Sequence, residues 1–231
     1  MPHSVLNLLL DELVTQLQEA CVFDEDLVVD EQAIGEIVET IPAMVTIHSF
    51  RTKKFFVFLN RKKRDFYGFE KRNMTHLNSL FYAKTFHPRT LHKIAHIYQF
   101  FYRGTDQPLH VTYRLRSQSG AYEKVEGVSK GVAWNTKGTL CYTASITCRA
   151  EELNFLSAIV TLGLRKLGER QQECLRWLLE GKTNAQIGDQ MGISPRTVEK
   201  HIAQIFEAAG VSGRGGLLEK VATGSTSISD D

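Results

Sequence analysis

The sequence is poor in the residues that mark several large classes of protein. It has four cysteines among 231 residues, and no pair has the two-residue spacing of a zinc site. The cysteines give no disulfide framework either, which predicts a reducing, cytoplasmic setting. No apolar run reaches the roughly 20 residues of a membrane span. The short apolar stretch from Val5 to Leu10 lacks the basic residues that precede the core of a signal peptide. We therefore expect no membrane association.

Patterns of enzyme chemistry are also missing. The sequence has no glycine-rich phosphate loop, no nucleophile elbow and no evident pair of catalytic carboxylates. Its composition is that of an ordinary globular protein, with 42% hydrophobic and 23% charged residues. The length suits two modest domains or one large one. We expect a protein that is not an enzyme.

Positive charge is absent from the start of the chain. The first fifty residues hold ten acidic side chains and no Lys or Arg, whereas residues 51–72 hold nine basic side chains and two acidic ones. Because the net charge is only +2, this asymmetry is more informative than the total. The two segments can be solvated faces of opposite sign. Alternatively, the acidic segment docks on the basic one, within a subunit or across a dimer.

Residues 181–214 carry the clearest pattern in the chain. Thr183 can cap a first helix, and Gln186 three residues later completes a capping box. Ser194 can cap a second helix that starts at Pro195, where the missing N–H costs nothing. The spacing predicts a helix-turn-helix, a geometry in which the second helix can enter the major groove of DNA.

Apolar and polar side chains separate onto opposite faces of these two helices, which meet at a tight corner over residues 191–193. The predicted buried residues are Ile187, Met191, Val198, Ile202 and Ile205. The second helix is left with an outward polar face formed by Arg196, Thr197, Glu199, Lys200 and Gln204. This exposed face makes a DNA-binding regulator the first interpretation.

One further helix on each side completes a four-helix domain, over residues 169–180 and 214–222. These helices and their glycine stops resemble the LuxR-type helix-turn-helix over about 48 residues without a gap. The residues that carry the resemblance are Leu167, Arg170, Glu173, Leu175, Gly181, Thr183, Asn184, Ile187, Ile193, Ser194, Thr197, Val198, His201, Ile205, Gly210, Val211 and Arg214. The resemblance implies a homodimeric transcription regulator whose partners are double-stranded DNA and, for an activator, RNA polymerase.

Four positions depart from the family pattern. Gly168 stands where Thr is usual, which weakens the cap of the opening helix, and Gln171 stands where Glu is usual. Glu199 replaces a common Lys; a carboxylate can accept from a cytosine amine but repels phosphate, which leaves Lys200 as the cationic contact. Gln204 replaces a common Asn and keeps an amide there.

The candidate DNA-binding residues form two groups. At the start of the first helix, free N–H groups and the helix dipole favour a phosphate. On the second helix, cations can bind phosphate or read guanine, Thr197 can contact phosphate or a thymine methyl, and His201 is either a phosphate contact or a packing residue. The full set is Lys182, Thr183, Asn184, Arg196, Thr197, Glu199, Lys200, His201 and Gln204. Residues 165–214 carry eight bases and six acids. One copy should therefore bind weakly, and a dimer on two half-sites should supply the affinity.

The middle of the chain mixes strand and helix patterns. Strands are predicted at 44–50, 54–59, 109–117, 122–134 and 140–148, and helices at 34–38, 60–67, 74–86 and 89–103. This order resembles a PAS domain, a sensor fold with a five-stranded antiparallel sheet and short helices. The matching residues are Ile41-Pro42-Ala43, His87-Pro88, Tyr113-Arg114-Leu115-Arg116, Gly120 and Tyr122. Together with the C-terminal helices, the resemblance implies an α+β protein.

A PAS core can be filled by its own side chains, or it can hold haem, flavin or a metabolite. The Asn-Cys-Arg setting of flavin photosensors is absent. His92 and His96 lie four residues apart on a predicted helix, as metal or haem ligands would, but they can equally be surface histidines. The many aromatic residues suggest a filled interior. No cofactor is therefore predicted. A small-molecule ligand stays open, beside a ligand-free role in dimerisation or protein interaction.

Two amphipathic helices flank the predicted sensor, over residues 4–20 and 151–166. The second carries a stripe of Leu153, Leu156, Val160, Leu164 and Leu167. This stripe can pack on its own domain or form a dimer seam. The last residues, 224–231, are rich in Ser, Thr and Asp and are expected to be disordered. The predicted segments are 1–33, 34–150 (sensor), 151–166 (connecting helix), 167–222 (DNA-binding domain) and 223–231.

Overall fold

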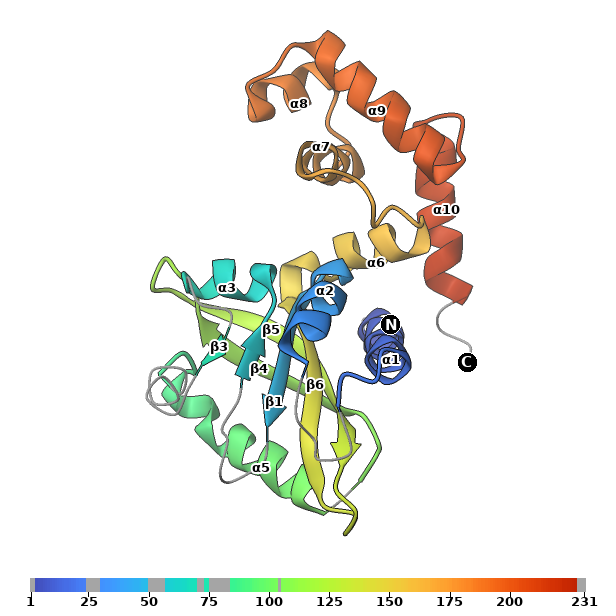
Figure 1. Ribbon diagram of the computed structural model, residues 1–231. Helices are drawn as coiled ribbons and strands as arrows, with labels where there is room; N and C mark the ends of the chain where they lie inside the picture. Colours follow the sequence, from blue (N-terminus) through green and yellow to red (C-terminus); the bar gives the residue numbers. More distant parts are fainter. Residues whose placement is uncertain are drawn as a thin grey trace. The chain divides into compact units, whose positions relative to one another are not determined.

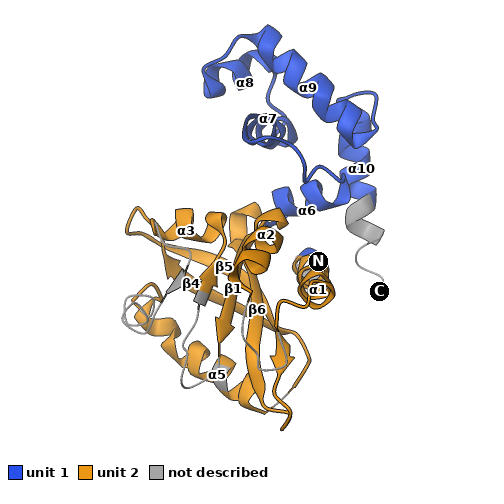
Figure 2. Ribbon diagram, in the orientation of Figure 1, with its two compact units in different colours: residues 1–5, 153–231 blue, residues 6–152 orange. Residues whose placement is uncertain are grey.

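The chain divides into two compact units (Figure 2). The computed structural model describes residues 3–23, 30–49, 57–69, 73–74, 84–103 and 105–227. The sheet unit comprises Leu6–Glu152, and the helical unit comprises Met1–Val5 and Leu153–Asp231. Within the described residues, no helix is apolar over a length that would cross a bilayer.

One antiparallel sheet forms the centre of the sheet unit, with its strands in the order β3-β2-β1-β6-β5-β4 (Figure 1). The strands are β1 (Met44–Ser49), β2 (Val57–Leu59), β3 (Asn73–Met74), β4 (Leu109–Arg116), β5 (Tyr122–Trp134) and β6 (Leu140–Arg149). The central pair, β1 and β6, runs in register from Met44↔Thr147 to Ser49↔Tyr142. The predicted α+β class and its five main strands are confirmed. The two-residue β3 is an addition at one edge that no sequence pattern marked.

The first two helices of the chain follow their sequence patterns closely. α1 (His3–Glu19) is the amphipathic helix predicted over residues 4–20, and its buried leucines are Leu6, Leu9, Leu10, Leu13 and Leu17. α2 (Glu31–Thr40) is longer than the predicted helix over 34–38. It starts early because the Asp30 carboxylate accepts the N–H groups of Gln32 and Ala33, an N-cap that satisfies two donors at the helix start.

The next helices begin and end at the predicted breaks. α3 (Arg61–Tyr67) ends at Gly68, whose φ of 72° lies in the left-handed region. η1 (Pro88–Thr90) starts directly after His87, and α5 (Leu91–Tyr102) follows it, which confirms the predicted break and most of the predicted helix over 89–103. The sequence chemistry of caps and prolines therefore places most element ends in the sheet unit.

A buried amide ties three elements of the sheet unit together. The Asn60 side chain is 1% exposed. Its Oδ1 accepts the N–H groups of Val45 and Lys63 at 2.9 and 3.1 Å. Its Nδ2 donates to the carbonyl oxygens of Ala43 at 2.8 Å and Val38 at 3.3 Å. One side chain thus caps α3 and fixes the turn between α2 and β1.

The helix predicted over 74–86 is wrong at both ends that the structure describes. Met74 lies in β3, and Phe86 forms a β-bridge with Leu115. Backbone hydrogen bonds extend this pairing along the edge of β4, from Arg116 N to Thr85 O and from His87 N to Arg114 O. Tertiary pairing overrides the local helical pattern here; residues 75–83 lie outside the described residues.

The opposite charges of the first segments meet at one place within the sheet unit. Glu39 at the end of α2 accepts the backbone N–H of Arg61 through both carboxylate oxygens at 3.0 Å. It also forms an ion pair with Arg64 at 3.4 Å. This contact favours docking within a subunit over two separate solvated faces. Several charged residues of both segments lie outside the described residues, namely 24–26, 51–54 and 70–72.

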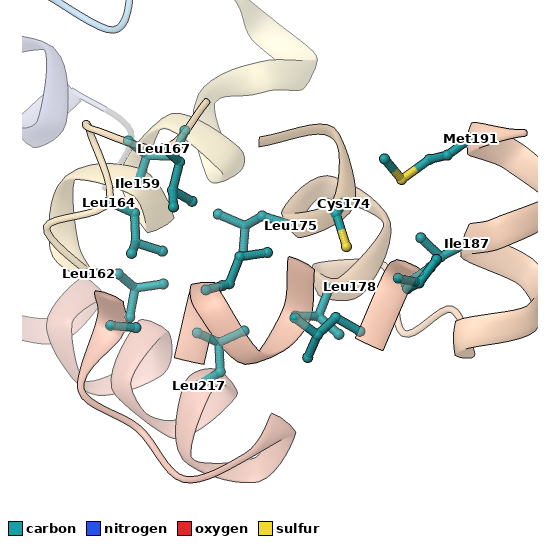
Figure 3. Packing of buried hydrophobic residues seen from close by; sticks show 14 residues of the cluster. Ile159, Leu162, Leu164, Leu167, Cys174, Leu175, Leu178, Ile187, Met191 and Leu217 are labelled. Carbon is teal, nitrogen blue, oxygen red and sulfur yellow. The ribbon is translucent and has the colours of Figure 1, made fainter. Parts of the chain in front are cut away.

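The helical unit packs around one apolar cluster. Its helices are α6 (Leu153–Thr161), α7 (Glu169–Leu179), α8 (Asn184–Met191), α9 (Pro195–Ala209) and α10 (Arg214–Ser227). Figure 3 shows side chains of this cluster gathered from α6, α7, α8 and α10 and from the segment after α6. Leu175, Ile187 and Ile205 are fully buried in it. The four predicted helices of the DNA-binding domain are therefore present and share one core.

Two predicted segment ends are wrong in this unit. The connecting helix ends at Thr161 rather than near residue 166, because Gly163 has a φ of 67° and Leu164 N donates to Ile159 O, a helix-ending pair of features. Leu164 consequently packs into the unit's own core instead of continuing a helical stripe. At the C-terminus, α10 continues to Ser227, into the segment expected to be disordered, where no proline forces a stop.

Candidate DNA-binding surface

The corner between α8 and α9 is tight because two glycines form it. Gly192 ends α8 with a φ of 65°, in the left-handed region. Gly188, one turn earlier, faces the chain that leaves the corner, and a Cβ there would lie 2.7 Å from the carbonyl oxygen of Ile193. Only glycine fits that approach. Gly188 carries no periodic signal, so no sequence pattern marks it.

Both predicted helix caps are present at this corner. Thr183 Oγ1 accepts the N–H of Gln186 at 3.3 Å, while Gln186 Oε1 accepts the N–H of Thr183 at 2.9 Å. Ser194 Oγ accepts the N–H of Thr197 at 3.2 Å, and Pro195 occupies the first turn of α9. These local bonds set the start of each helix and therefore the angle at which α9 leaves the corner.

The outer face of α9 is polar, and part of it is unpartnered. On its opposite face, α9 buries the predicted Val198, Ile202 and Ile205, together with Ala209. Arg196, Glu199 and Lys200 are exposed, and none of the three makes a hydrogen bond or ion pair with another described residue. Thr197 is half-buried, with its hydroxyl 2.9 Å from that of Ser194. Two cations and one carboxylate thus stand free near the start of α9.

The start of α8 is held from the far end of the domain. One amino group of the Arg214 guanidinium donates to the carbonyl oxygen of Lys182 at 2.7 Å, and the other donates to Asn184 Oδ1 at 2.7 Å. The Asn184 amide N–H groups donate to no other described residue and are therefore available as donors. Arg214 belongs to the predicted helix-turn-helix pattern, but its role in fixing Asn184 depends on a contact across 30 residues that no local pattern reveals.

Two of the positions that depart from the family pattern contact each other. Gln171 Nε2 donates to Gln204 Oε1 at 3.0 Å, joining α7 to α9. Gln171 Oε1 also accepts the backbone N–H of Gly168 at 2.9 Å. Gln171 therefore compensates for the weak cap that Gly168 predicts. Gln204 remains exposed, but its carbonyl oxygen is engaged.

His201 has features of both roles expected for it, a phosphate contact and a packing residue. The residue is half-buried on α9, and its Nδ1 is buried without a hydrogen-bond partner among the described residues. The other candidate residues of α9 that flank it, Lys200 and Gln204, are exposed. The ring thus packs on the domain along one edge while the surface that surrounds it is polar.

Aromatic side chains pack together in the sheet unit, the part of the chain in which a PAS-like sensor could hold a ligand. Phe66, Tyr67 and Leu115 are buried in one cluster, with Phe69 and Phe86 packed against it. His92 and His96 are both exposed on α5, so their rings lie at the surface. The described residues contain no group of three potential metal ligands. Four of the aromatic residues noted in the sequence, Phe55, Phe56, Phe81 and Tyr82, lie outside the described residues.

Comparison with known families assigns the helical unit. Residues 165–221 match the family described as bacterial regulatory proteins, luxR family. The chain is 39% identical over 62 residues to the transcriptional activator protein AhyR of Aeromonas hydrophila and to AsaR of Aeromonas salmonicida. Each match spans 24% of this chain and 24% of the relative. Residues 165–221 therefore form a LuxR-type helix-turn-helix domain.

Similar solved structures cover more of the chain at lower identity. A Vibrio cholerae VqmA dimer without target DNA is similar over 85% of this chain and 88% of that chain, with 17% identity and a TM-score of 0.33. A sensory box histidine kinase/response regulator from Burkholderia thailandensis is similar over 60% of this chain and 100% of that chain, with 14% identity and a TM-score of 0.38. Such low TM-scores add nothing to the arrangement described above.

Proposed function

We propose that the protein is a DNA-binding transcription regulator that acts as a homodimer. In this proposal, the sheet unit receives a signal, in the form of a small ligand, and controls the binding of paired helix-turn-helix domains to an operator with two half-sites. The observation that carries the proposal is the free polar face at the start of α9, in a domain of the LuxR type. Such a role places the protein in the compartment that holds the DNA.

The residues of α9 have different roles in this proposal. Arg196 and Lys200 neutralise phosphates or read guanine, because a cation without an internal partner loses little on binding. Glu199 accepts from a cytosine amine and disfavours a nearby phosphate. Gln204 contributes through its amide N–H groups, since its oxygen is bonded to Gln171.

The start of α8 supplies a phosphate contact in the same proposal. The Asn184 amide and the Thr183 hydroxyl can both donate outward, because their oxygens already accept hydrogen bonds. Lys182 adds a positive charge beside the N-terminal end of the helix. These contacts are independent of base sequence, and they would fix the register of α9 in the groove.

Pairing is needed because one domain carries little net charge. Eight bases and six acids between residues 165 and 214 leave a net charge of +2. Affinity for DNA depends strongly on the number of neutralised phosphates. Two copies on half-sites about one helical turn apart would double the contacts.

A second candidate role for the sheet unit follows from its filled interior. The aromatic cluster around Phe66 and Tyr67 leaves this unit well packed by its own side chains. The unit can then act as a ligand-free module for dimerisation or for docking a protein partner. Native mass spectrometry of the purified chain separates the two roles: a retained small molecule supports sensing, and a ligand-free dimer supports the interaction module.

The DNA-binding role is tested with Lys200→Ala. Operator fragments are first selected from random duplex DNA, and affinity is then measured by fluorescence anisotropy over a series of salt concentrations. We expect about a tenfold loss of affinity and a slope of log affinity against log salt that is smaller by about one, because one phosphate contact is lost.

The matched control is Lys137→Ala, which removes one exposed cation from the turn between β5 and β6. Its affinity and salt slope should equal those of the unchanged protein. If Lys200→Ala keeps the slope but loses sequence preference, Lys200 reads a base instead of a phosphate. If the unchanged protein selects no DNA sequence at all, the proposed function is wrong.

A further inference from the structure

A hollow of about 410 Å³ lies at the edge of the sheet unit. Residues of η1, the start of α5, β4 and β5 line it. Four cationic side chains contribute to its wall: Arg89 from η1, Lys93 from α5, Arg114 from β4 and Lys124 from β5. None of the described residues that line it is acidic. Its size falls within the range of small-molecule sites, about 300–1,000 Å³.

The two cations on the strands, Arg114 and Lys124, destabilise the sheet by repelling each other. Arg114 and Lys124 are directly opposite each other in the antiparallel register of β4 and β5. Side chains at such positions point to the same face, and like charges there destabilise a sheet. Lys124 is partly compensated by Glu126, whose carboxylate lies 3.1 Å away. Arg114 has no ion-pair partner among the described residues, nor has Arg89.

Two further side chains of the wall, Lys93 and His87, also present donors, whereas the hydroxyls of Thr90 and Thr112 donate within the chain, to His87 O and Glu126 Oε2. Lys93 Nζ donates one hydrogen bond to the carbonyl oxygen of Thr112 at 2.6 Å, and its two other hydrogens remain available. His87 Nδ1 accepts the backbone N–H of Arg89 at 3.1 Å. The hydrogen of a neutral His87 ring therefore sits on Nε2, as a donor. A wall of donors and positive charge matches an acceptor-rich, negatively charged ligand.

We propose that this cationic hollow binds a small metabolite through phosphate or carboxylate groups that together carry two or more negative charges. The guanidinium groups of Arg89 and Arg114 are the principal contacts, because both can form paired hydrogen bonds with an oxyanion. Lys93 and the His87 Nε2–H donate from the η1–α5 side. Binding would relieve the repulsion between Arg114 and Lys124. All the residues that line the hollow belong to the sheet unit, and one of them, Tyr113, also packs against the aromatic cluster.

The test is isothermal titration of the full chain with inorganic phosphate and, separately, with citrate, at constant ionic strength set by sodium chloride. Saturable binding of either probe supports the site: phosphate alone indicates a phosphate ester, and citrate alone indicates a polycarboxylate. Arg114→Gln should weaken binding by about tenfold, since one charge-assisted contact is lost. The same probe should raise the thermal midpoint of the unchanged chain more than that of R114Q at equal concentration.

Arg116→Gln is the matched control. Arg116 lies two residues further along β4 on the same face, is also exposed, and does not line the hollow. R116Q should bind the probe as the unchanged chain does. The thermal midpoint without ligand also discriminates: R114Q should be at least as stable as the unchanged chain, because it relieves a like-charge pair. Equal losses in R114Q and R116Q, or no saturable binding of either probe, would overturn the proposal.

Operator affinity is measured in parallel, so that this site and the proposed DNA binding succeed or fail independently. R114Q should keep the affinity and salt slope of the unchanged chain. If R114Q instead lowers the salt slope and no probe binds, Arg114 contacts DNA and the metabolite site is wrong.

Discussion

The two units use their polar side chains in opposite ways. In the sheet unit, Asn60 and Lys63 are each 1% exposed, and both are bonded inside the chain; Lys63 Nζ donates to Thr147 Oγ1 at 2.7 Å. On α9 of the helical unit, Arg196 and Lys200 are exposed and have no internal partner. Burying a polar group is costly unless it is bonded, so the buried set stabilises a fold. The exposed set contributes little to folding and remains available to a partner.

This contrast predicts that substitutions in the two units act on different properties. Each unit also holds one tryptophan, Trp134 in the sheet unit and Trp177 in the helical unit. With Trp134→Phe or Trp177→Phe as the background, fluorescence during denaturation reports one unit at a time.

The largest effect is expected for Gly188→Ala, within the helical unit. The added Cβ would lie 2.7 Å from the Ile193 carbonyl oxygen, so the corner must open. We expect a loss of about 2–4 kcal/mol in the free energy of unfolding reported by Trp177. Gly216→Ala is the control, since its Cβ would meet nothing closer than 3.6 Å. An unchanged unfolding midpoint for Gly188→Ala would show that the corner is not rigid.

Asn60→Ala should be nearly as damaging, but in the sheet unit. It removes the partner of two backbone N–H groups and two carbonyl oxygens. Buried donors without acceptors each cost about 1–3 kcal/mol, and we expect a total loss of about 2–4 kcal/mol reported by Trp134. Asn135→Ala, in an exposed turn, removes two similar bonds that water can replace, and should cost about 1 kcal/mol or less. Equal losses for both variants would contradict the role of burial.

A smaller effect concerns the pH dependence of the sheet unit. Burial, and then the nearby charge of Lys63, lowers the pKa of His48 to about 4. Between pH 6.5 and 4 the unfolded chain therefore binds a proton that the folded chain does not, and the free energy of unfolding falls as the pH falls through this window. We expect a loss on the order of 1–3 kcal/mol. Denaturation at several pH values should show this loss reduced in His48→Gln.

Lys63 also makes the free energy of unfolding increase with pH, but in a higher pH range. Burial lowers the pKa of its amino group to about 7. The unfolded chain keeps this proton up to about pH 10.5, so the free energy of unfolding rises as the pH increases from 7 to 10.5. Lys63→Met should flatten that rise while His48→Gln should not. If His48→Gln flattened this rise and Lys63→Met did not, Lys63 would not be the group that titrates between pH 7 and 10.5.

The smallest effect is expected where the helical unit does bond a polar side chain internally. Gln171→Ala removes the bonds to Gly168 and Gln204 and should cost about 1 kcal/mol. Gln171→Glu keeps an acceptor for the Gly168 N–H and adds a charge that favours a helix N-terminus, so its net effect should be about zero. Thermal unfolding followed by Trp177 fluorescence compares the two; a Glu variant less stable than the Ala variant would contradict this reasoning.

Features encoded within three or four residues were predictable. The caps at Thr183 and Ser194, the end of the helix predicted over 60–67 and the corner over 191–193 all appear as expected, because their chemistry is local. The apolar periodicity likewise identified the buried face of α9. The α+β class followed from the order of such local elements.

The remainder depended on contacts between residues far apart in the chain. Pairing with β4 replaced the helix predicted to end at Phe86, and the core of the helical unit took up Leu164. At the candidate site, the exposure of Arg196 and Lys200 was predictable, but the bond from Arg214 to Asn184 was not. That these side chains contact DNA stays a prediction.

The bond between Gln171 and Gln204 has a consequence for how related sequences vary. Each residue departs from the family pattern, and the structure makes them partners across 33 positions. A carboxylate at position 171 cannot donate a hydrogen bond, so it requires a donor at position 204. An amide at position 171 can pair with either an acceptor or a donor at position 204. The two positions should therefore have changed together during descent. Among relatives with an intact α7–α9 contact, those with Glu at position 171 should lack Asp or Glu at position 204.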